Sequence, residues 1–187
     1  MIAILPTSLP KVMTYQREPT ISQVKKAQSL AKKDTLVFTG CSNYISDQIA
    51  SVAKAYTVYN GAPMHLYDAT GSVEEEAPRG GRCRRELIKG TAIAIEVARK
   101  ANRKLIIAGN IPVEHQEYFD QKVKPFLDNQ IRYVGPVNDV QKNELLGKAL
   151  ALLMPIEWNE PFGIVMAEAM ACGTPVLGFN KGSVPEV

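Results

Sequence analysis

Short apolar runs alternate with segments of helical periodicity from Thr91 to the end of this 187-residue chain. Four of the runs predict buried strands, at residues 104–108, 131–134, 151–154 and 175–179. Helices are predicted between them at residues 91–101, 113–127, 140–149 and 163–171, the third capped by Asn138 or Asp139. Such alternation is typical of an α/β fold in which helices flank a Rossmann-like parallel sheet.

Glycines follow the predicted strands. In a parallel sheet every strand-to-helix loop leaves at the same edge, and ligands bind in the crevice there. Gly109, Gly135, Gly163 and Gly182 lie at or near these loops, where a missing side chain lets the backbone approach a ligand or simply makes a tight turn. The sequence leaves both interpretations open.

The first third of the chain predicts part of another α/β domain. Strands are expected at residues 11–15 and 36–39, and helices at residues 21–32 and 43–55. A strand followed by turn residues at 57–63 serves as a linker. We therefore divide the chain into residues 1–60, a partial domain, and residues 61–187, a Rossmann-like domain.

Composition excludes several classes of function. The 22 basic and 19 acidic residues give a net charge of +3, too mild to favour nucleic acid as a partner. The sequence has no apolar run long enough for a membrane span and no signal peptide, so a cytoplasmic location is expected. Cys41, Cys83, Cys172, His65 and His115 are scattered without metal-ligand spacing, so no metal site is predicted.

Glu168 is the residue that most strongly suggests chemistry. It lies eight residues after Glu160, within residues 164–171, a stretch that is otherwise entirely apolar. A buried carboxylate needs a hydrogen-bonding partner. Two adjacent hydroxyls of a ribose would suit it, and a core arginine or a helix end would serve as well. A helix beginning near Gly163 also favours a phosphate or a sugar hydroxyl at its N-terminus.

The motif around these glutamates resembles family 4 glycosyltransferases. It consists of Glu160-x7-Glu168 with Pro161-Phe162-Gly163 between, then residues 169–176 and 182–186. The resemblance extends over roughly residues 56–187. It implies a two-domain GT-B enzyme that moves a sugar from a nucleotide diphosphate donor to a carbohydrate or small-molecule acceptor with retention of configuration. UDP-sugar and GDP-sugar are both candidate donors, and neither a metal nor another cofactor is implied.

The resemblance also implies roles for individual residues. Glu168 would hold the ribose hydroxyls, and Glu160 the hydroxyls of the donor sugar. Backbone amides would hold the sugar or the phosphate at Phe162, Gly163 and Ile164. The base would lie near Tyr133, Val134 and Gly135, beside Gly109 at the same edge. Residues 1–60 would be an acceptor-side fragment and residues 61–187 the nucleotide-sugar-binding domain.

Two cations would neutralise the departing diphosphate in such an enzyme. Arg84 and Lys89 have the spacing of the Arg-x4-Lys pair of the family, and Arg82 is an alternative to Arg84. A strand should precede this pair, but residues 68–86 are rich in Glu, Gly and Arg, so no buried strand is expected there. We interpret residues 69–86 as an out-of-frame translation between two compensating insertions or deletions.

The chain is expected to be truncated at both ends and therefore to have little transferase activity alone. Two alternatives to a transferase remain open from the sequence. One is a GT-B relative that hydrolyses or epimerises a nucleotide sugar and uses a similar donor site, and the other is a noncatalytic nucleotide-binding fragment. A dehydrogenase is disfavoured because no Gly-x-Gly-x-x-Gly follows any predicted strand.

Overall fold

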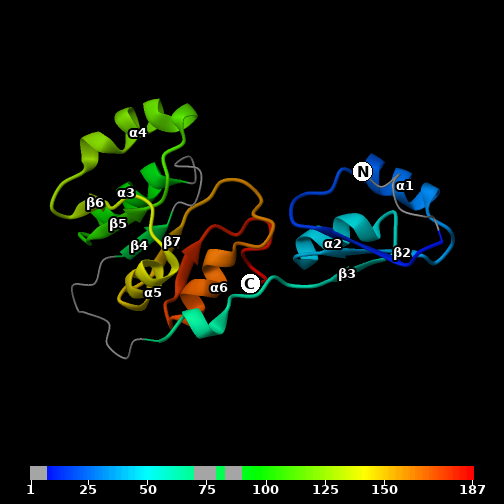
Figure 1. Ribbon diagram of the computed structural model, residues 1–187. Coiled ribbons are helices and arrows are strands. Elements are labelled where there is room, and N and C mark those ends of the chain that lie inside the picture. Colours follow the sequence, from blue (N-terminus) through cyan, green and yellow to red (C-terminus); the bar gives the residue numbers. More distant parts are fainter. Residues whose placement is uncertain (1–7, 70–78, 83–89) are drawn as a thin grey trace. The chain divides into compact units, whose positions relative to one another are not determined.

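The computed structural model describes residues 8–69, 79–82 and 90–187. These residues form two compact units (Figure 1). Unit 1 comprises the described part of Met1–Gly61 together with Asn159–Gly163 and Lys181–Val187, and unit 2 comprises that of Ala62–Trp158 together with Ile164–Asn180. The division of the chain at residues 60 and 61 stays a prediction.

Unit 1 contains a three-stranded parallel sheet. Its strands are β1 (Lys11–Tyr15), β2 (Leu36–Gly40) and β3 (Ala55–Thr57), in the order β1-β2-β3. Two helices connect them, α1 (Ile21–Leu30) and α2 (Asn43–Ala50). The predicted helix 43–55 is wrong at its C-terminal end, because Ala55 pairs with Phe38 of β2 and so becomes part of β3.

Unit 2 carries the remaining parallel strands. Strands β4 (Arg79–Arg82), β5 (Leu105–Ala108) and β6 (Ile131–Tyr133) pair in that order, and β7 (Leu152–Met154) pairs with β8 (Val176–Gly178). Strand β4 also contacts β7. The helices are α3 (Thr91–Lys100), α4 (Gln116–Lys122), α5 (Asp139–Gly147) and α6 (Ile164–Ala171). Short 3-10 turns lie at Met64–Leu66, Val113–His115 and Lys124–Phe126.

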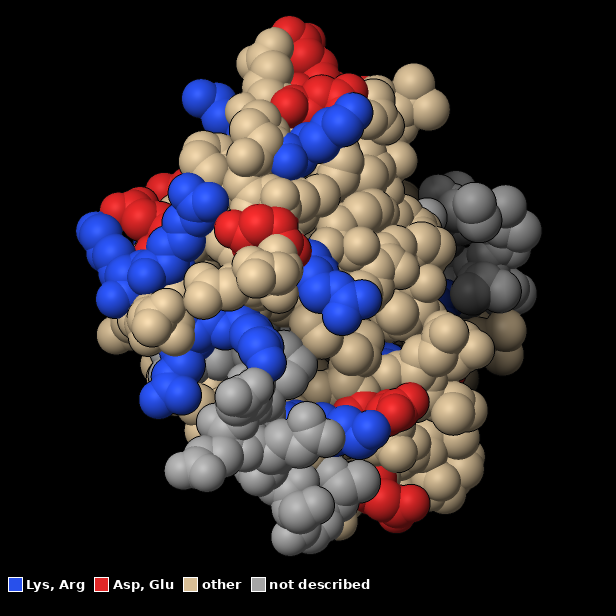
Figure 2. Space-filling view, turned by 90° about the vertical axis from the view of Figure 1, so that its left-hand side faces the viewer, with Lys and Arg blue, Asp and Glu red and all other residues tan. Residues whose placement is uncertain are grey.

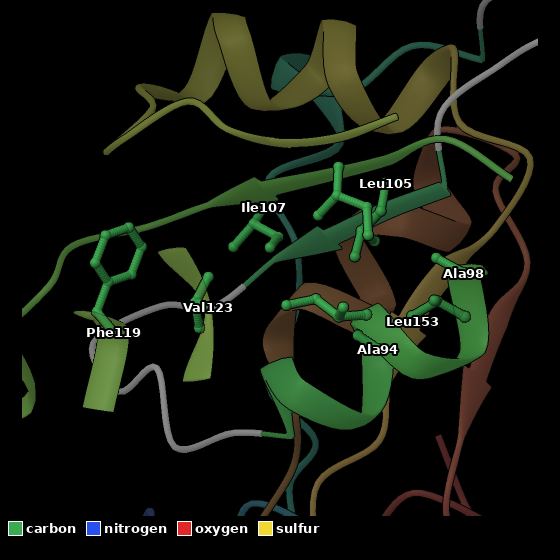
Figure 3. Close-up of a cluster of buried hydrophobic side chains, with 9 residues drawn as sticks. Ala94, Ala98, Leu105, Ile107, Phe119, Val123 and Leu153 are labelled. Carbon is green, nitrogen blue, oxygen red and sulfur yellow. The ribbon is translucent and has the colours of Figure 1, made fainter. Parts of the chain in front are cut away.

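Two neighbouring residues of β7 show which helices cover each face of the sheet in unit 2. Leu153 joins a core cluster with side chains of α3, β5, α4 and β6, whereas Leu152 joins a second cluster with Leu146 of α5 and Ala169 of α6. Successive strand residues point to opposite faces of a sheet. Helices α3 and α4 therefore cover one face and α5 and α6 the other, which confirms the predicted α/β fold. Figure 3 shows the first cluster, with Ala94 and Ala98 of α3 lying across from Leu105 and Ile107 of β5.

Two predicted elements of unit 2 need correction. Residues 79–82 form β4, in parallel register with residues 105–108, although the sequence predicted no strand there. Pairing with β5 supplies the backbone hydrogen bonds that the local composition does not suggest. The predicted helix 113–127 is interrupted at Val123, because Pro125 lacks the N–H that would continue α-helical hydrogen bonding.

Helix α5 begins with a complete capping box. The Asn138 side chain accepts a hydrogen bond from the Gln141 N–H at 2.9 Å, and the Gln141 side chain accepts one from the Asn138 N–H at 3.0 Å. Of the two caps predicted from the sequence, the structure therefore selects Asn138.

Replacing Asn138 by alanine is expected to lower the free energy of unfolding by about 1 kcal/mol, because the cap satisfies an amide at the start of α5. Thr20 occupies the same position before α1 without a side-chain cap hydrogen bond, so Thr20→Ala serves as the control. Urea denaturation followed by circular dichroism measures both variants. Equal losses from the two substitutions would contradict the assigned role of the cap.

Candidate functional site

The carboxyl ends of β5 and β6 form a compact edge in unit 2. The Gly109 N–H donates to the Gly135 carbonyl at 2.9 Å, and the Tyr133 hydroxyl donates to the Gly109 carbonyl at 2.6 Å. The Val134 N–H donates to the Ile107 carbonyl at 3.0 Å. Four residues that the sequence assigned to donor binding are thus brought together: Gly109, Tyr133, Val134 and Gly135.

Gly135 leaves open space at this edge. It has a φ of +74°, and a Cβ built on it would meet no atom within 4 Å. Val134 beside it is 39% exposed, whereas the Tyr133 ring packs against Phe119 with centroids 5.0 Å apart. The edge therefore offers an accessible backbone next to a rigidly held aromatic ring, an arrangement that can accommodate a planar ligand group.

Glu168 lies in α6 at the centre of a buried polar network. It is 4% exposed. Its Oε1 accepts a hydrogen bond from Lys142 Nζ at 2.7 Å and another from the Tyr67 hydroxyl at 2.9 Å. Lys142 Nζ also lies 2.7 Å from Oδ1 of Asp139. Of the partners that the sequence left open for Glu168, a basic side chain is present among the described residues, namely Lys142.

Burial also raises the pKa values of two side chains near Glu168, Tyr67 and Cys172. It raises the pKa of the Tyr67 hydroxyl, and the hydrogen bond to Glu168 acts in the same direction, while Lys142 opposes both. Burial and the neighbouring Glu168 charge likewise raise the pKa of the Cys172 thiol. Tyr67 is therefore a protonated hydrogen-bond donor at neutral pH, and Cys172 a protonated thiol.

Glu160 belongs to a loop that is held within unit 1. Its carbonyl accepts hydrogen bonds from the Ser183 N–H at 2.8 Å and the Ser183 hydroxyl at 2.9 Å. A Cβ on Gly182 would lie only 2.4 Å from the same carbonyl oxygen, so a larger residue there would displace the loop. Phe162 is buried, and its ring lies 6.2 Å from the Tyr59 ring.

The other predicted site residues lie in both units or outside the described part of the chain. Gly163 is buried with a φ of +77°, and Ile164, which is 40% exposed, begins α6. Glu160, Phe162 and Gly163 belong to unit 1, whereas Ile164 and Glu168 belong to unit 2. Arg84 and Lys89 lie outside the described residues.

Lys142, Tyr67 and Glu186 are polar residues whose roles the sequence analysis missed. Lys142 lies four residues before the buried Leu146 of α5, so helical spacing would have placed it on the buried face. Tyr67 follows a short 3-10 turn without periodicity and gave no signal. Glu186 accepts hydrogen bonds from the Asn43 and Tyr44 N–H groups at the start of α2, at 2.8 and 2.9 Å.

Residues 8–69, 79–82 and 90–187 offer neither a metal-binding cluster nor a membrane-spanning helix. They contain no group of three or more His, Cys, Asp or Glu residues that could hold a metal ion. Nor is any described helix both long and apolar enough to cross a membrane. On the face in Figure 2, basic side chains are interspersed with acidic ones. Ion pairs between exposed side chains of unit 2 include Lys100–Glu96 at 2.7 Å and Lys124–Asp120 at 3.4 Å.

The chain has relatives among characterised and uncharacterised proteins. It is 27% identical over 169 residues to an uncharacterised 42.6 kDa protein in the cps region of Klebsiella pneumoniae, covering 86% of this chain and 43% of that protein. It is 30% identical over 92 residues to N-acetyl-alpha-D-glucosaminyl L-malate synthase of Bacillus anthracis, covering 49% of this chain and 23% of that enzyme. The chain thus spans less than half of either protein.

Solved structures share the fold. The Anabaena protein HepE, solved in complex with UDP and glucose, superimposes with a TM-score of 0.76 at 21% identity, over 95% of this chain and 55% of that one. The same protein has also been solved with UDP-glucose. This likeness confirms the GT-B type of α/β fold. The family model described as "Glycosyl transferases group 1" matches residues 81–187, more than half of the sequence, and the chain therefore belongs to the group 1 glycosyl transferases.

Proposed function

We propose that this chain contributes the donor-binding part of a retaining glycosyltransferase of family 4. Its donor would be a UDP-sugar or GDP-sugar, and its acceptor a carbohydrate or small molecule. The observation that carries the proposal is the Glu168 carboxylate, which is buried in an apolar helix and oriented by Lys142 and Tyr67. Membership of the group 1 glycosyl transferases supports the sugar-transfer chemistry, and the UDP complexes of the Anabaena protein support a nucleotide donor.

Each group of predicted site residues would bind a different part of the nucleotide-sugar donor. The carboxylate of Glu168 accepts hydrogen bonds from ribose hydroxyls, and the edge around Gly135 and Tyr133 receives the base. Glu160 accepts hydrogen bonds from the donor sugar, with the amides of residues 162–164 as donors to the sugar or phosphate. Arg84 and Lys89 neutralise the diphosphate as it leaves. No step of this scheme uses a metal ion.

Calorimetric titration of the chain with UDP and with GDP, in the presence of a chelator, tests the proposal. We expect saturable binding of one nucleotide, and we expect Glu168→Gln to weaken it by about tenfold to a hundredfold, the scale of lost hydrogen bonds to a charged group. Glu144→Gln is the control, because Glu144 is an exposed carboxylate of α5 that pairs with Lys148; it should leave binding unchanged.

Two results would contradict the proposal. One is a folded chain that binds neither nucleotide. The other is binding that Glu168→Gln leaves as strong as in the unsubstituted chain, since the carboxylate would then make no contact with the ligand.

A further inference from the structure

Two donors from different parts of unit 2 converge on one oxygen of Glu168. Lys142 Nζ comes from α5 and the Tyr67 hydroxyl from the segment before β4, and both contact Oε1, at 2.7 and 2.9 Å. The ammonium group also lies 4.9 Å from the centroid of the Tyr67 ring. Each pair among these three side chains is therefore in contact, which fixes the orientation of the carboxylate about its last torsion angle.

Neighbouring contacts hold the framework of this network in place. The Asn143 side chain, next to Lys142 in α5, accepts hydrogen bonds from the Asp68 N–H at 3.1 Å and from the Cys172 thiol at 3.2 Å. Beside the network, Leu146, Ala169 and Cys172 form an apolar cluster with Tyr67. Helix α5 and the Tyr67 segment are thus connected twice to α6 and the residue that follows it, once by the network and once by Asn143.

Stability alone does not account for such a network. A buried ion pair is often no more stabilising than apolar side chains of the same volume, because both charges lose their hydration. The other residues of α6 are apolar, and apolar side chains at both 142 and 168 would avoid that loss. The network is well suited instead to hold an acceptor oxygen in one place, as ligand-binding groups require.

We propose that Lys142 and Tyr67 are positioning residues that orient the Glu168 carboxylate toward the vicinal hydroxyls of a ribose, and that they thereby set the preference for ribonucleotides over 2′-deoxyribonucleotides. The inference rests on the proposed function, since it names what prepares Glu168 for the donor. A rigid acceptor discriminates strongly against a ligand that lacks one hydroxyl, whereas a mobile carboxylate can turn to compensate for the loss.

The ratio of dissociation constants for dUDP and UDP, or for dGDP and GDP if guanine is the base, tests this inference. In the unsubstituted chain we expect the ribonucleotide to bind about tenfold more tightly, the scale of one hydrogen bond to a charged group. Tyr67→Phe keeps the ring under the ammonium group and removes only the hydroxyl, so it should reduce the ratio several-fold. Lys142→Met should bring the ratio close to one, and Lys142→Arg should restore part of it.

Lys148→Met is the matched control. Lys148 is the residue that caps the C-terminus of α5, and like Lys142 it pairs with a glutamate, Glu144, at 2.8 Å, but its side chain is 45% exposed. This substitution should leave the ratio unchanged. Circular dichroism identifies a temperature at which each variant is folded, and Tyr67→Phe decides the question if Lys142→Met does not fold.

The outcomes separate this inference from the proposed function. If the chain prefers ribonucleotides and Glu168→Gln removes the preference, but Tyr67→Phe and Lys142→Met keep it, the positioning role is wrong and the proposed function stands. If no nucleoside diphosphate binds to the folded chain, both are wrong. A ratio that falls with Tyr67→Phe and Lys142→Met, but not with Lys148→Met, supports the positioning role, because a general loss of stability would weaken both ligands alike.

Discussion

Replacing Gly90 by alanine is expected to lower the free energy of unfolding by about 2–5 kcal/mol, as the sum of two effects. Gly90 has a φ of +77°, a left-handed conformation that costs a residue with a side chain about 1–2 kcal/mol. A Cβ on it would also lie 2.0 Å from the Pro155 carbonyl oxygen and 2.8 Å from the carbonyl carbon. These are backbone atoms, so the clash is relieved only by moving α3 away from the segment after β7, with a further loss of about 1–3 kcal/mol or more.

Gly135 provides a control that separates the two effects. Its φ of +74° nearly equals that of Gly90, yet a Cβ there would meet nothing within 4 Å. Gly135→Ala should therefore lose only the backbone part, about 1–2 kcal/mol. Urea denaturation curves of the two variants and the unsubstituted chain give the comparison. If both substitutions destabilise the chain equally, crowding against Pro155 contributes nothing.

Hydrophobic periodicity was enough to predict most of the regular elements. The strand at residues 11–15 and the starts of the helices at Ile21, Asn43 and Thr91 coincide with those of the structure. The largest error lies at β4, because residues 79–82 contain two glycines and two arginines and carry no strand signal. Their conformation is determined by pairing with residues 105–108, an interaction between segments far apart in the sequence that no local pattern encodes.

Only part of the polar network around Glu168 could be predicted from the sequence. A glutamate in an otherwise apolar helix shows that a partner is needed, and helical spacing in α5 could have identified Lys142, which is 3% exposed. Tyr67 could not be predicted, because it is separated from Glu168 by 101 residues and lies in an aperiodic segment. The roles of Glu160, Arg84 and Lys89 come from the resemblance alone and stay predictions.

Replacing Lys142 by methionine is expected to lower the free energy of unfolding by about 3–5 kcal/mol, because it breaks a buried ion pair by removing one partner. The side chains of Lys142 and Glu168 are 4% and 6% exposed, so water cannot replace the lost partner without opening the space between α5 and α6. The Tyr67 hydroxyl still donates to Glu168, but a neutral donor does not compensate for the loss of the ammonium charge.

A second substitution shows whether the loss of stability arises from the charge that remains on Glu168 when Lys142 is replaced. The double variant Lys142→Met/Glu168→Gln removes both charges of this pair, and the amide oxygen can still accept a hydrogen bond from Tyr67, so most of the stability should return. Lys148→Met, which breaks the exposed pair with Glu144 on the same helix, should leave the denaturation midpoint almost unchanged, since water solvates both groups. If Lys142→Met proves as harmless as Lys148→Met, the carboxylate of Glu168 does not depend on its cation, and the network described here does not constrain it.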